Sequence, residues 1–328
     1  MWGAHDVPLM PDETTAIAAS RAQTGRPARV LLIANRASRR GAEMRAAALE
    51  RLAREGVAVE AVAPDGREAL AKAIATARGD VDAILVLGGD GTLNAAAPGL
   101  IAAGLPLGVL PGGTANDFAR TLGIEPDIDR AIDCILAGGL RTIDLGEVNG
   151  HPFFNVASFG LSVALANALT QETKKRWGVF AYALAALRAL TSARPFHAEI
   201  DALGADGKRT QARVKSWQIA VGNGVYYGGG MAVRDDAQID NGRLELYSLE
   251  MERLWSLLPM LFHFRAGQHR WWREVRTLRA VEIAITTRKP RSINADGEII
   301  SRTPARFRVL KQALRVYAPP PEDGARNA

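Results

Sequence analysis

The sequence predicts two domains, an α/β domain with a parallel, doubly wound sheet followed by an antiparallel β-sandwich. From Arg29 to about Gly139, short apolar runs alternate with helix-like stretches, the pattern of a parallel sheet covered by helices. After Ile143–Gly146 the segments become short, β-branched or aromatic, and are separated by Gly and Asn turns, as in an antiparallel sandwich. With 328 residues, 48% of them hydrophobic, the chain is long enough for two cores.

In the first half, short aliphatic runs predict strands and the Ala- and Leu-rich stretches between them predict helices. The expected strands span residues 30–34, 57–63, 83–87 and 107–110, and the expected helices span 39–54, 67–78 and 92–103. Glycine-rich turns follow the third and fourth strands. Because ligands bind at the carboxyl ends of strands in a parallel sheet, these turns mark the expected site.

The second half predicts strands interrupted by two helices. The strands are expected over 153–158, 196–201, 214–221, 244–249 and 281–286, and the helices near 177–191 and from 252 to about 268. Two closing runs, 306–310 and 314–317, are expected to return to the first domain. The predicted division is therefore 28–143 with 305–318, then 144–304, between flexible tails over 1–27 and 319–328.

Composition excludes several classes of protein. A single cysteine, Cys134, excludes a disulfide framework and a cysteine-ligated metal, and it suits a reducing cytoplasm. The first 27 residues lack the basic start and apolar block of a signal peptide. A net charge of +6 and a pI near 9.7 allow an anionic partner. Without zinc-finger spacing or a basic region with heptads, nucleic acid is not the expected partner.

The two glycine-rich turns predict a site for a polyphosphate. Gly88–Asn94 reads GGDGTLN and Pro111–Asp117 reads PGGTAND, and each follows a predicted strand and leads into a helix-like pattern. Unpaired N–H groups and the helix dipole favour an anion there. Neither turn carries a Lys, so backbone amides, Thr hydroxyls and a metal are expected to meet the phosphates. The expected contacts come from Gly88, Gly89, Gly91, Thr92, Gly112, Gly113 and Thr114, with simple helix capping as the alternative for both threonines.

Three motifs together resemble the diacylglycerol kinase catalytic-domain family, which includes bacterial lipid kinases, sphingosine kinases and ceramide kinases. They are GGDGTLN at Gly88–Asn94, TANDFAR at Thr114–Arg120 and the late DGE at Asp296–Glu298. The first motif alone is shared with NAD kinases and phosphofructokinases, whereas the combination is specific. The resemblance runs from about Arg29 to Pro319, although the loop after Asn35 lacks the proline of the family's pattern.

The resemblance implies an ATP-dependent lipid kinase with its active site in a cleft between an α/β nucleotide domain and a β-sandwich. It places Asn35, Asn116 and Asp117 with the nucleotide. Phosphoryl transfer itself needs positioning and neutralisation of phosphate charge. A carboxylate beside phosphates is repulsive unless a cation intervenes, so Asp90 is expected to hold Mg²⁺, directly or through water. The alternative role for Asp90 is a helix N-cap.

The resemblance also supplies the acid–base chemistry. Asp296 corresponds to the family's general base, which accepts the proton of the attacking lipid hydroxyl, and Glu298 is expected to support it. Without the resemblance, Asp296-Gly297 reads as a common hairpin turn. Asp240 lies in a segment, DNGRL, that is similar to one where some bacterial members bind a structural Mg²⁺, and a plain β-turn is the alternative.

A lipid substrate is expected to arrive from a membrane surface, with the protein cytoplasmic and peripheral to the inner face. The apolar segment 254–262, followed by aromatic and basic residues up to Arg273, suits a bilayer interface or a core helix. The longest apolar segments are shorter than the roughly 20 residues that cross a bilayer. The alternatives are an NAD kinase-like small-molecule kinase and a non-catalytic nucleotide or lipid sensor, and a homodimer remains open.

Overall fold

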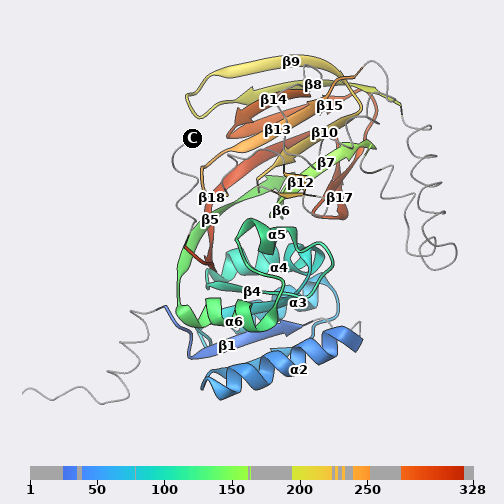
Figure 1. The fold of residues 1–328 in the computed structure, drawn as a ribbon. Helices are drawn as coiled ribbons and strands as arrows, with labels where there is room; N and C mark the ends of the chain where they lie inside the picture. Colours follow the sequence, from blue (N-terminus) through green and yellow to red (C-terminus); the bar gives the residue numbers. More distant parts are fainter. Residues whose placement is uncertain are drawn as a thin grey trace, which may run out of the picture.

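The computed structural model describes residues 25–34, 39–77, 79–161, 163, 194–223, 226–227, 231–232, 239–251 and 275–320. They form an α/β domain and a β-sandwich, drawn at the bottom and top of Figure 1. The predicted fold class is therefore confirmed. Asn35 and the two apolar helices expected near 177–191 and 252–268 lie outside the described residues.

The α/β domain contains a parallel sheet of four strands in the order β2-β1-β3-β4. Its elements are β1 (Arg29–Ala34), α2 (Arg39–Arg54), β2 (Ala58–Val62), α3 (Arg67–Thr76), β3 (Ala83–Gly88), α4 (Asp90–Ala103), β4 (Leu107–Pro111), α5 (Asp117–Thr121) and α6 (Ile128–Ala137). Helix α2 packs with α6, and α3 packs with α4. Strands β1 and β3 are buried almost throughout because helices cover both faces of the sheet.

Two antiparallel sheets form the sandwich. One contains β14 (Val275–Ala280), β13 (Leu244–Leu249), β10 (Gln218–Gly222), β7 (Val156–Gly160), β16 (Ser292–Ala295) and β17 (Glu298–Arg302), in this order. The other continues the α/β sheet through β18 (Ala305–Tyr317), β15 (Glu282–Thr287), β8 (Phe196–Leu203) and β9 (Arg209–Ser216). Strand β5 (Leu140–Val148) pairs with β18, and β6 (His151–Phe153) pairs with β5. A short ribbon pairs β11 (Tyr226–Tyr227) with β12 (Met231–Ala232). The buried rings of Phe153, Phe159 and Phe307 belong to the core of this domain.

Strand β18 joins the two domains. Residues 305–308 pair with β15 of the sandwich, whereas Val316 pairs with Leu107 of β4. Its register with β5 shifts between Leu310 and Leu314, where Gln312 has a φ of 52°. The two closing runs are thus one continuous strand, and the segment 305–318 divides between the two hydrophobic cores.

Two other predicted strands are broken where the chain changes partners. The run 214–221 divides at Trp217 into β9 and β10, because β9 pairs with β8 and β10 pairs with β7 and β13 of the other sheet. The run 153–158 divides at Phe154 and Asn155, whose backbone N–H groups bind the side chain of Asp296. This second break belongs to the candidate site.

Candidate functional site

The two glycine turns lie against each other at the carboxyl ends of β3 and β4. These strands are paired in register up to Gly88 and Pro111, and the Gly112 N–H donates to the Gly88 carbonyl at 2.9 Å. A Cβ added to Gly113 would lie 2.6 Å from the Gly89 Cα, closer than real contacts allow. The backbones of the two turns therefore approach too closely for a side chain to fit between them, which explains the glycine in both turns.

Asn116 fixes the shape of the second turn. Its φ is 50°, its Oδ1 accepts from the Gly113 N–H at 2.9 Å, and its Nδ2 donates to the Gly113 carbonyl at 3.0 Å. Gly112, Gly113 and Thr114 are exposed. The turn is thus a braced, solvent-facing loop beside the first turn of α4.

Asp90 joins the two turns. Its carboxylate accepts from the backbone N–H groups of Asp117 at 3.2 Å and Phe118 at 3.0 Å. These are the first two residues of α5, so Asp90 caps a helix that follows the second glycine turn. The side chain of Thr92 folds back over Gly88, since a Cβ on Gly88 would lie 2.6 Å from the Thr92 Oγ1.

Asp117 is buried, and its Oδ1 lies 3.7 Å from Nη1 of Arg120. The adjacent Phe118 is fully buried and its ring centroid lies 4.4 Å from that of Phe154. Since Phe154 follows β6 directly, this contact packs the second glycine turn and α5 against the sandwich. The second glycine turn and α5 therefore lie at the junction of the two domains.

Asp296 and Gly297 form the two-residue turn of the β16–β17 hairpin. Their φ values are 48° and 97°, as a tight hairpin turn of this type requires. The Asp296 carboxylate accepts four hydrogen bonds, from the N–H groups of Phe154 (2.7 Å), Asn155 (3.0 Å) and Val156 (3.2 Å) and from Nδ2 of Asn94 (3.1 Å). The turn expected without the resemblance is thus present, and the predicted role of Asp296 as a base stays a prediction.

Asn94 and Glu298 bring the late DGE motif to the first glycine turn. Asn94 is buried in α4 and binds Asp296 across the domain boundary. Glu298 lies over the start of the same helix, because a Cβ on Gly91 would be 3.3 Å from its Oε1. Arg67 at the start of α3 donates to both Asn94 and Glu298. Motifs about 200 residues apart in the chain therefore form one cluster.

Burial raises the pKa of Asp296 above its ordinary value, and the four N–H donors oppose this shift. Burial disfavours the charged carboxylate, whereas each donor stabilises it. The group is therefore a carboxylate whose proton affinity is increased by its surroundings, as suits a base.

The surroundings of Asp240 do not fit a metal site. Its Oδ2 accepts from Nε (3.0 Å) and Nη2 (2.8 Å) of Arg141, so a guanidinium already neutralises this carboxylate. No group of three His, Cys, Asp or Glu side chains in the described ranges could hold a metal ion. Asp90 differs, because Mg²⁺ is commonly held by one or two carboxylates together with substrate phosphates, and Asp90 lies between the glycine turns.

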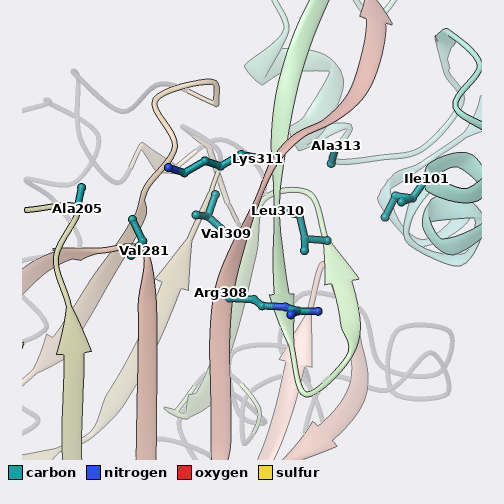
Figure 2. Close-up of a pocket in the computed structure, with 8 residues that line it drawn as sticks. All are labelled: Ile101, Ala205, Val281, Arg308, Val309, Leu310, Lys311 and Ala313. Carbon is teal, nitrogen blue, oxygen red and sulfur yellow. The ribbon is translucent and has the colours of Figure 1, made fainter. Parts of the chain in front are cut away.

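An open pocket of about 670 Å³ lies elsewhere, where β18 bends between the domains. Figure 2 shows its lining residues, Ile101, Ala205, Val281, Arg308, Val309, Leu310, Lys311 and Ala313. Ile101 is near the opposite end of α4 from the glycine turn, and Arg308 is paired with Glu147. None of the predicted site residues in the described ranges lines this pocket, which is therefore separate from the cluster around Asp296.

Three residues of the cluster, Arg67, Asn94 and Asn155, were not predicted from the sequence as site residues. Asn94 ends the GGDGTLN motif and is four residues after Asp90 on α4, so helical spacing could have placed it on the same face. Arg67 carries no comparable signal, because its partners are distant in the chain.

An α/β domain with the GGDGT sequence in its first glycine turn, joined to a β-sandwich, is the architecture of one class of two-domain kinases. Residues 29–148 match the family described as the diacylglycerol kinase catalytic domain, and residues 155–318 match the YegS C-terminal NAD kinase beta sandwich-like domain. The chain therefore belongs to the diacylglycerol kinase family.

Curated relatives and solved structures agree with this assignment. The chain is 32% identical over 243 residues to a diacylglycerol kinase of Bacillus subtilis (73% of this chain and 78% of that one). It is 30% identical over 244 residues to a diacylglycerol kinase of Staphylococcus carnosus, with the same coverage. A structure from Bacillus anthracis superposes with a TM-score of 0.76 at 25% identity, covering 90% of this chain and 96% of that one. A second Bacillus anthracis structure, described as a diacylglycerol kinase, shares the fold, with a TM-score of 0.71 at 24% identity over 90% of this chain and 98% of that one.

Proposed function

We propose that this protein transfers the γ-phosphate of ATP to the hydroxyl of a diacylglycerol-like lipid. The observation that carries the proposal is the bond between Asn94 Nδ2 and Asp296 Oδ2. It ties a carboxylate of the sandwich to the helix whose N-terminus follows the first glycine turn. A base held next to a phosphate site would provide the positioning that phosphoryl transfer needs.

The nucleotide phosphates would lie along the exposed second turn and the N-terminus of α4. The dipole of this 14-residue helix favours anions at that end. Mg²⁺ arriving with ATP would meet Asp90, which retains acceptor capacity beyond its bonds to Asp117 and Phe118. The metal would neutralise phosphate charge during transfer.

Asp296 would act as the general base. The lipid hydroxyl oxygen forms a bond to the γ-phosphorus, while the bond from that phosphorus to the β,γ-bridging oxygen breaks and ADP leaves with the electron pair. The hydroxyl proton passes to the Asp296 carboxylate. Its increased proton affinity supports this role.

The donors on Asp296 restrict how the hydroxyl reaches it. A carboxylate has about four acceptor sites, and four N–H groups occupy them. Three of these are backbone groups fixed by the β6–β7 turn. The side-chain amide of Asn94 is therefore the donor that can move to admit the substrate.

The lipid would be reached at a membrane surface, on which the protein docks peripherally from the cytoplasm. The net charge of +6 favours acidic lipid. In the described part of the chain, no helix has both the length and the apolarity to span a bilayer.

The test is transfer of labelled γ-phosphate from ATP, with Mg²⁺, to a panel of diacylglycerol, phosphatidylglycerol, sphingosine and ceramide in mixed micelles, with NAD as a separate arm. The proposal expects label on a lipid and none on NAD. Label on NAD would instead support an NAD kinase-like enzyme. Binding of ATP without transfer to any acceptor would support a non-catalytic sensor.

A further inference from the structure

Arg67 connects three segments of the site through one nitrogen atom. Its Nη2 donates to Oδ1 of Asn94 at 3.1 Å and also to Oε2 of Glu298. Arg67 begins α3, Asn94 is in α4, and Glu298 begins β17 of the sandwich. The guanidinium thus holds the DGE hairpin and the first glycine helix together, although Arg67 and Glu298 are each nearly half exposed (45% and 47%).

This contact decides which way the Asn94 amide faces. With Oδ1 on the guanidinium, Nδ2 faces Asp296 Oδ2 at 3.1 Å and also lies 3.4 Å from the Pro152 carbonyl. The flipped amide would place N–H against the cation and oxygen against the carboxylate, which is repulsive on both sides. Asn94 is only 1% exposed, so water cannot replace a lost partner at low cost.

We propose that Arg67 is a positioning residue that orients Asn94 toward Asp296 and holds Glu298 against the α/β domain. Asn94 is the single side-chain donor among the four on the Asp296 carboxylate. Arg67 therefore controls the one hydrogen bond that can yield to a substrate hydroxyl without moving the backbone. The kinetic part of this inference rests on the proposed lipid kinase function.

The first test compares Arg67→Met and Arg67→Lys with wild-type protein. Misplacement of the amide and hairpin should lower kcat for lipid phosphorylation by about 10- to 100-fold in Arg67→Met. The KM for ATP should change little, because the hydrogen bonds of Arg67 in the described structure go to Asn94 and Glu298, and neither residue is among the expected phosphate contacts. A Lys ammonium can donate to both acceptors, so Arg67→Lys should recover part of the loss.

Arg276→Met is the matched control. Arg276 is 45% exposed, like Arg67, and its Nε lies 2.7 Å from Glu250 Oε1 outside the site. This variant should lose an ion pair of similar exposure and keep the wild-type kcat. Unchanged or faster turnover in Arg67→Met would overturn the proposal, as would an equal loss in Arg276→Met.

A double-mutant cycle separates positioning through Asn94 from an independent role. If Arg67 acts through Asn94, then Arg67→Met should cost far less when added to Asn94→Ala than when added to wild type. If the two losses in kcat multiply, Arg67 acts independently of Asn94 and the proposal is wrong.

A titration of Asp296 tests the same contact without a lipid substrate. Among the described residues, the charged groups linked to this carboxylate are Arg67 on α3 and Glu298 on its own hairpin. Losing the Asn94 donor removes an interaction that favours the charged form, so the pKa should rise in both Asn94→Ala and Arg67→Met. Carboxyl ¹³C NMR, assigned with Asp296→Asn, measures it. An unchanged pKa in Arg67→Met contradicts the proposal, whereas a shifted pKa without lipid phosphorylation by wild type contradicts only the proposed function.

Discussion

Two hairpins of this protein carry the same Asp-Gly dipeptide in different environments. Asp206-Gly207 joins β8 to β9, is exposed, and uses its carboxylate on its own turn, where Oδ1 accepts from the Lys208 N–H at 3.0 Å. Asp296-Gly297 joins β16 to β17, and its carboxylate accepts four N–H groups from α4 and the β6–β7 turn. Both glycines have positive φ, 79° and 97°.

The turns themselves also differ, because Asp296-Gly297 is a two-residue turn in which Asp296 has a φ of 48°, whereas Asp206-Gly207 lies in the longer loop between Leu203 and Arg209 and Asp206 does not have a positive φ. The dipeptide alone therefore determines neither the turn nor the surroundings of its carboxylate, which depend on the neighbouring strands. Strand β16 pairs with β7, with Ala295 opposite Ala157, so the tip of its hairpin reaches the broken strand at residues 154–156. Strand β9 is at the edge of its sheet, and the loop of its hairpin borders the pocket beside β18 through Ala205, not the broken strand at residues 154–156. The environment of the carboxylate in each hairpin depends on which strand lies next to it.

Asp-to-Asn substitutions in the two hairpins should give the largest difference in kcat. Asp296→Asn should reduce kcat by about 10²- to 10⁴-fold, the usual contribution of a general base, with ATP affinity largely kept. Asp206→Asn should leave kcat unchanged. Steady-state transfer and ATP titration on both variants measure this, after thermal unfolding has confirmed that each is folded. Similar kcat values for the two variants would remove the distinction between the turns.

Two capping carboxylates extend the comparison to the α/β domain. Asp90 caps α5 from within the site, and Asp127 caps α6 outside it, where its side chain accepts from the Arg130 N–H at 2.9 Å. Replacement of either by Ala should cost about 1 kcal/mol of unfolding free energy. Asp90→Ala should also lower Mg²⁺-dependent turnover by at least about tenfold, because it alters the phosphate site. If Asp90→Ala and Asp127→Ala have equal turnover, Asp90 is a cap only.

Disturbing the contact between the two glycine turns should have a smaller effect, mainly on stability. Gly113→Ala places a Cβ 2.6 Å from the Gly89 Cα and should cost about 1–3 kcal/mol of stability, with weaker ATP binding. Gly139→Ala is the control, since its nearest atom would be 3.3 Å away. Chemical denaturation and ATP titration measure the two effects. Wild-type ATP affinity in Gly113→Ala would show that this contact does not shape the nucleotide site.

Breaking the ion pair between Asp240 and Arg141 should have the smallest effect on stability. Because Arg141 neutralises this carboxylate, Asp240→Asn should change unfolding free energy by no more than about 1 kcal/mol. Adding Mg²⁺ should not change the melting temperature of wild type through this site. A Mg²⁺-dependent stabilisation that disappears in Asp240→Asn would show a metal site there.

Local sequence patterns predicted the α/β domain well. The helix expected over 39–54 matches α2, and the apolar runs of the parallel sheet match β1, β3 and β4 within one or two residues, because burial on both faces gives continuous apolar strands. The sandwich was harder to predict, since a strand that changes sheets at Trp217 keeps its β pattern on both sides of the break.

Local motifs predict some residues of the candidate site, and tertiary contacts add others that the sequence did not indicate. Asp296 and the glycine turns have recognisable local sequences. Asn94 and Arg67 acquire their roles only when the sandwich places Asp296 and Glu298 beside α3 and α4. No local pattern indicates that Arg141 binds Asp240, 99 positions away.

The most direct test is the pH dependence of single-turnover phosphate transfer in wild type and Asp296→Asn. The base works only when deprotonated, so the rate should fall as the pH decreases through its pKa. Since burial raises the pKa of Asp296, this decline should occur at higher pH than for an ordinary Asp near 3.9. The account predicts that Asp296→Asn lacks the decline and retains only a slow, pH-independent rate. The same decline in both proteins would contradict Asp296 as the base.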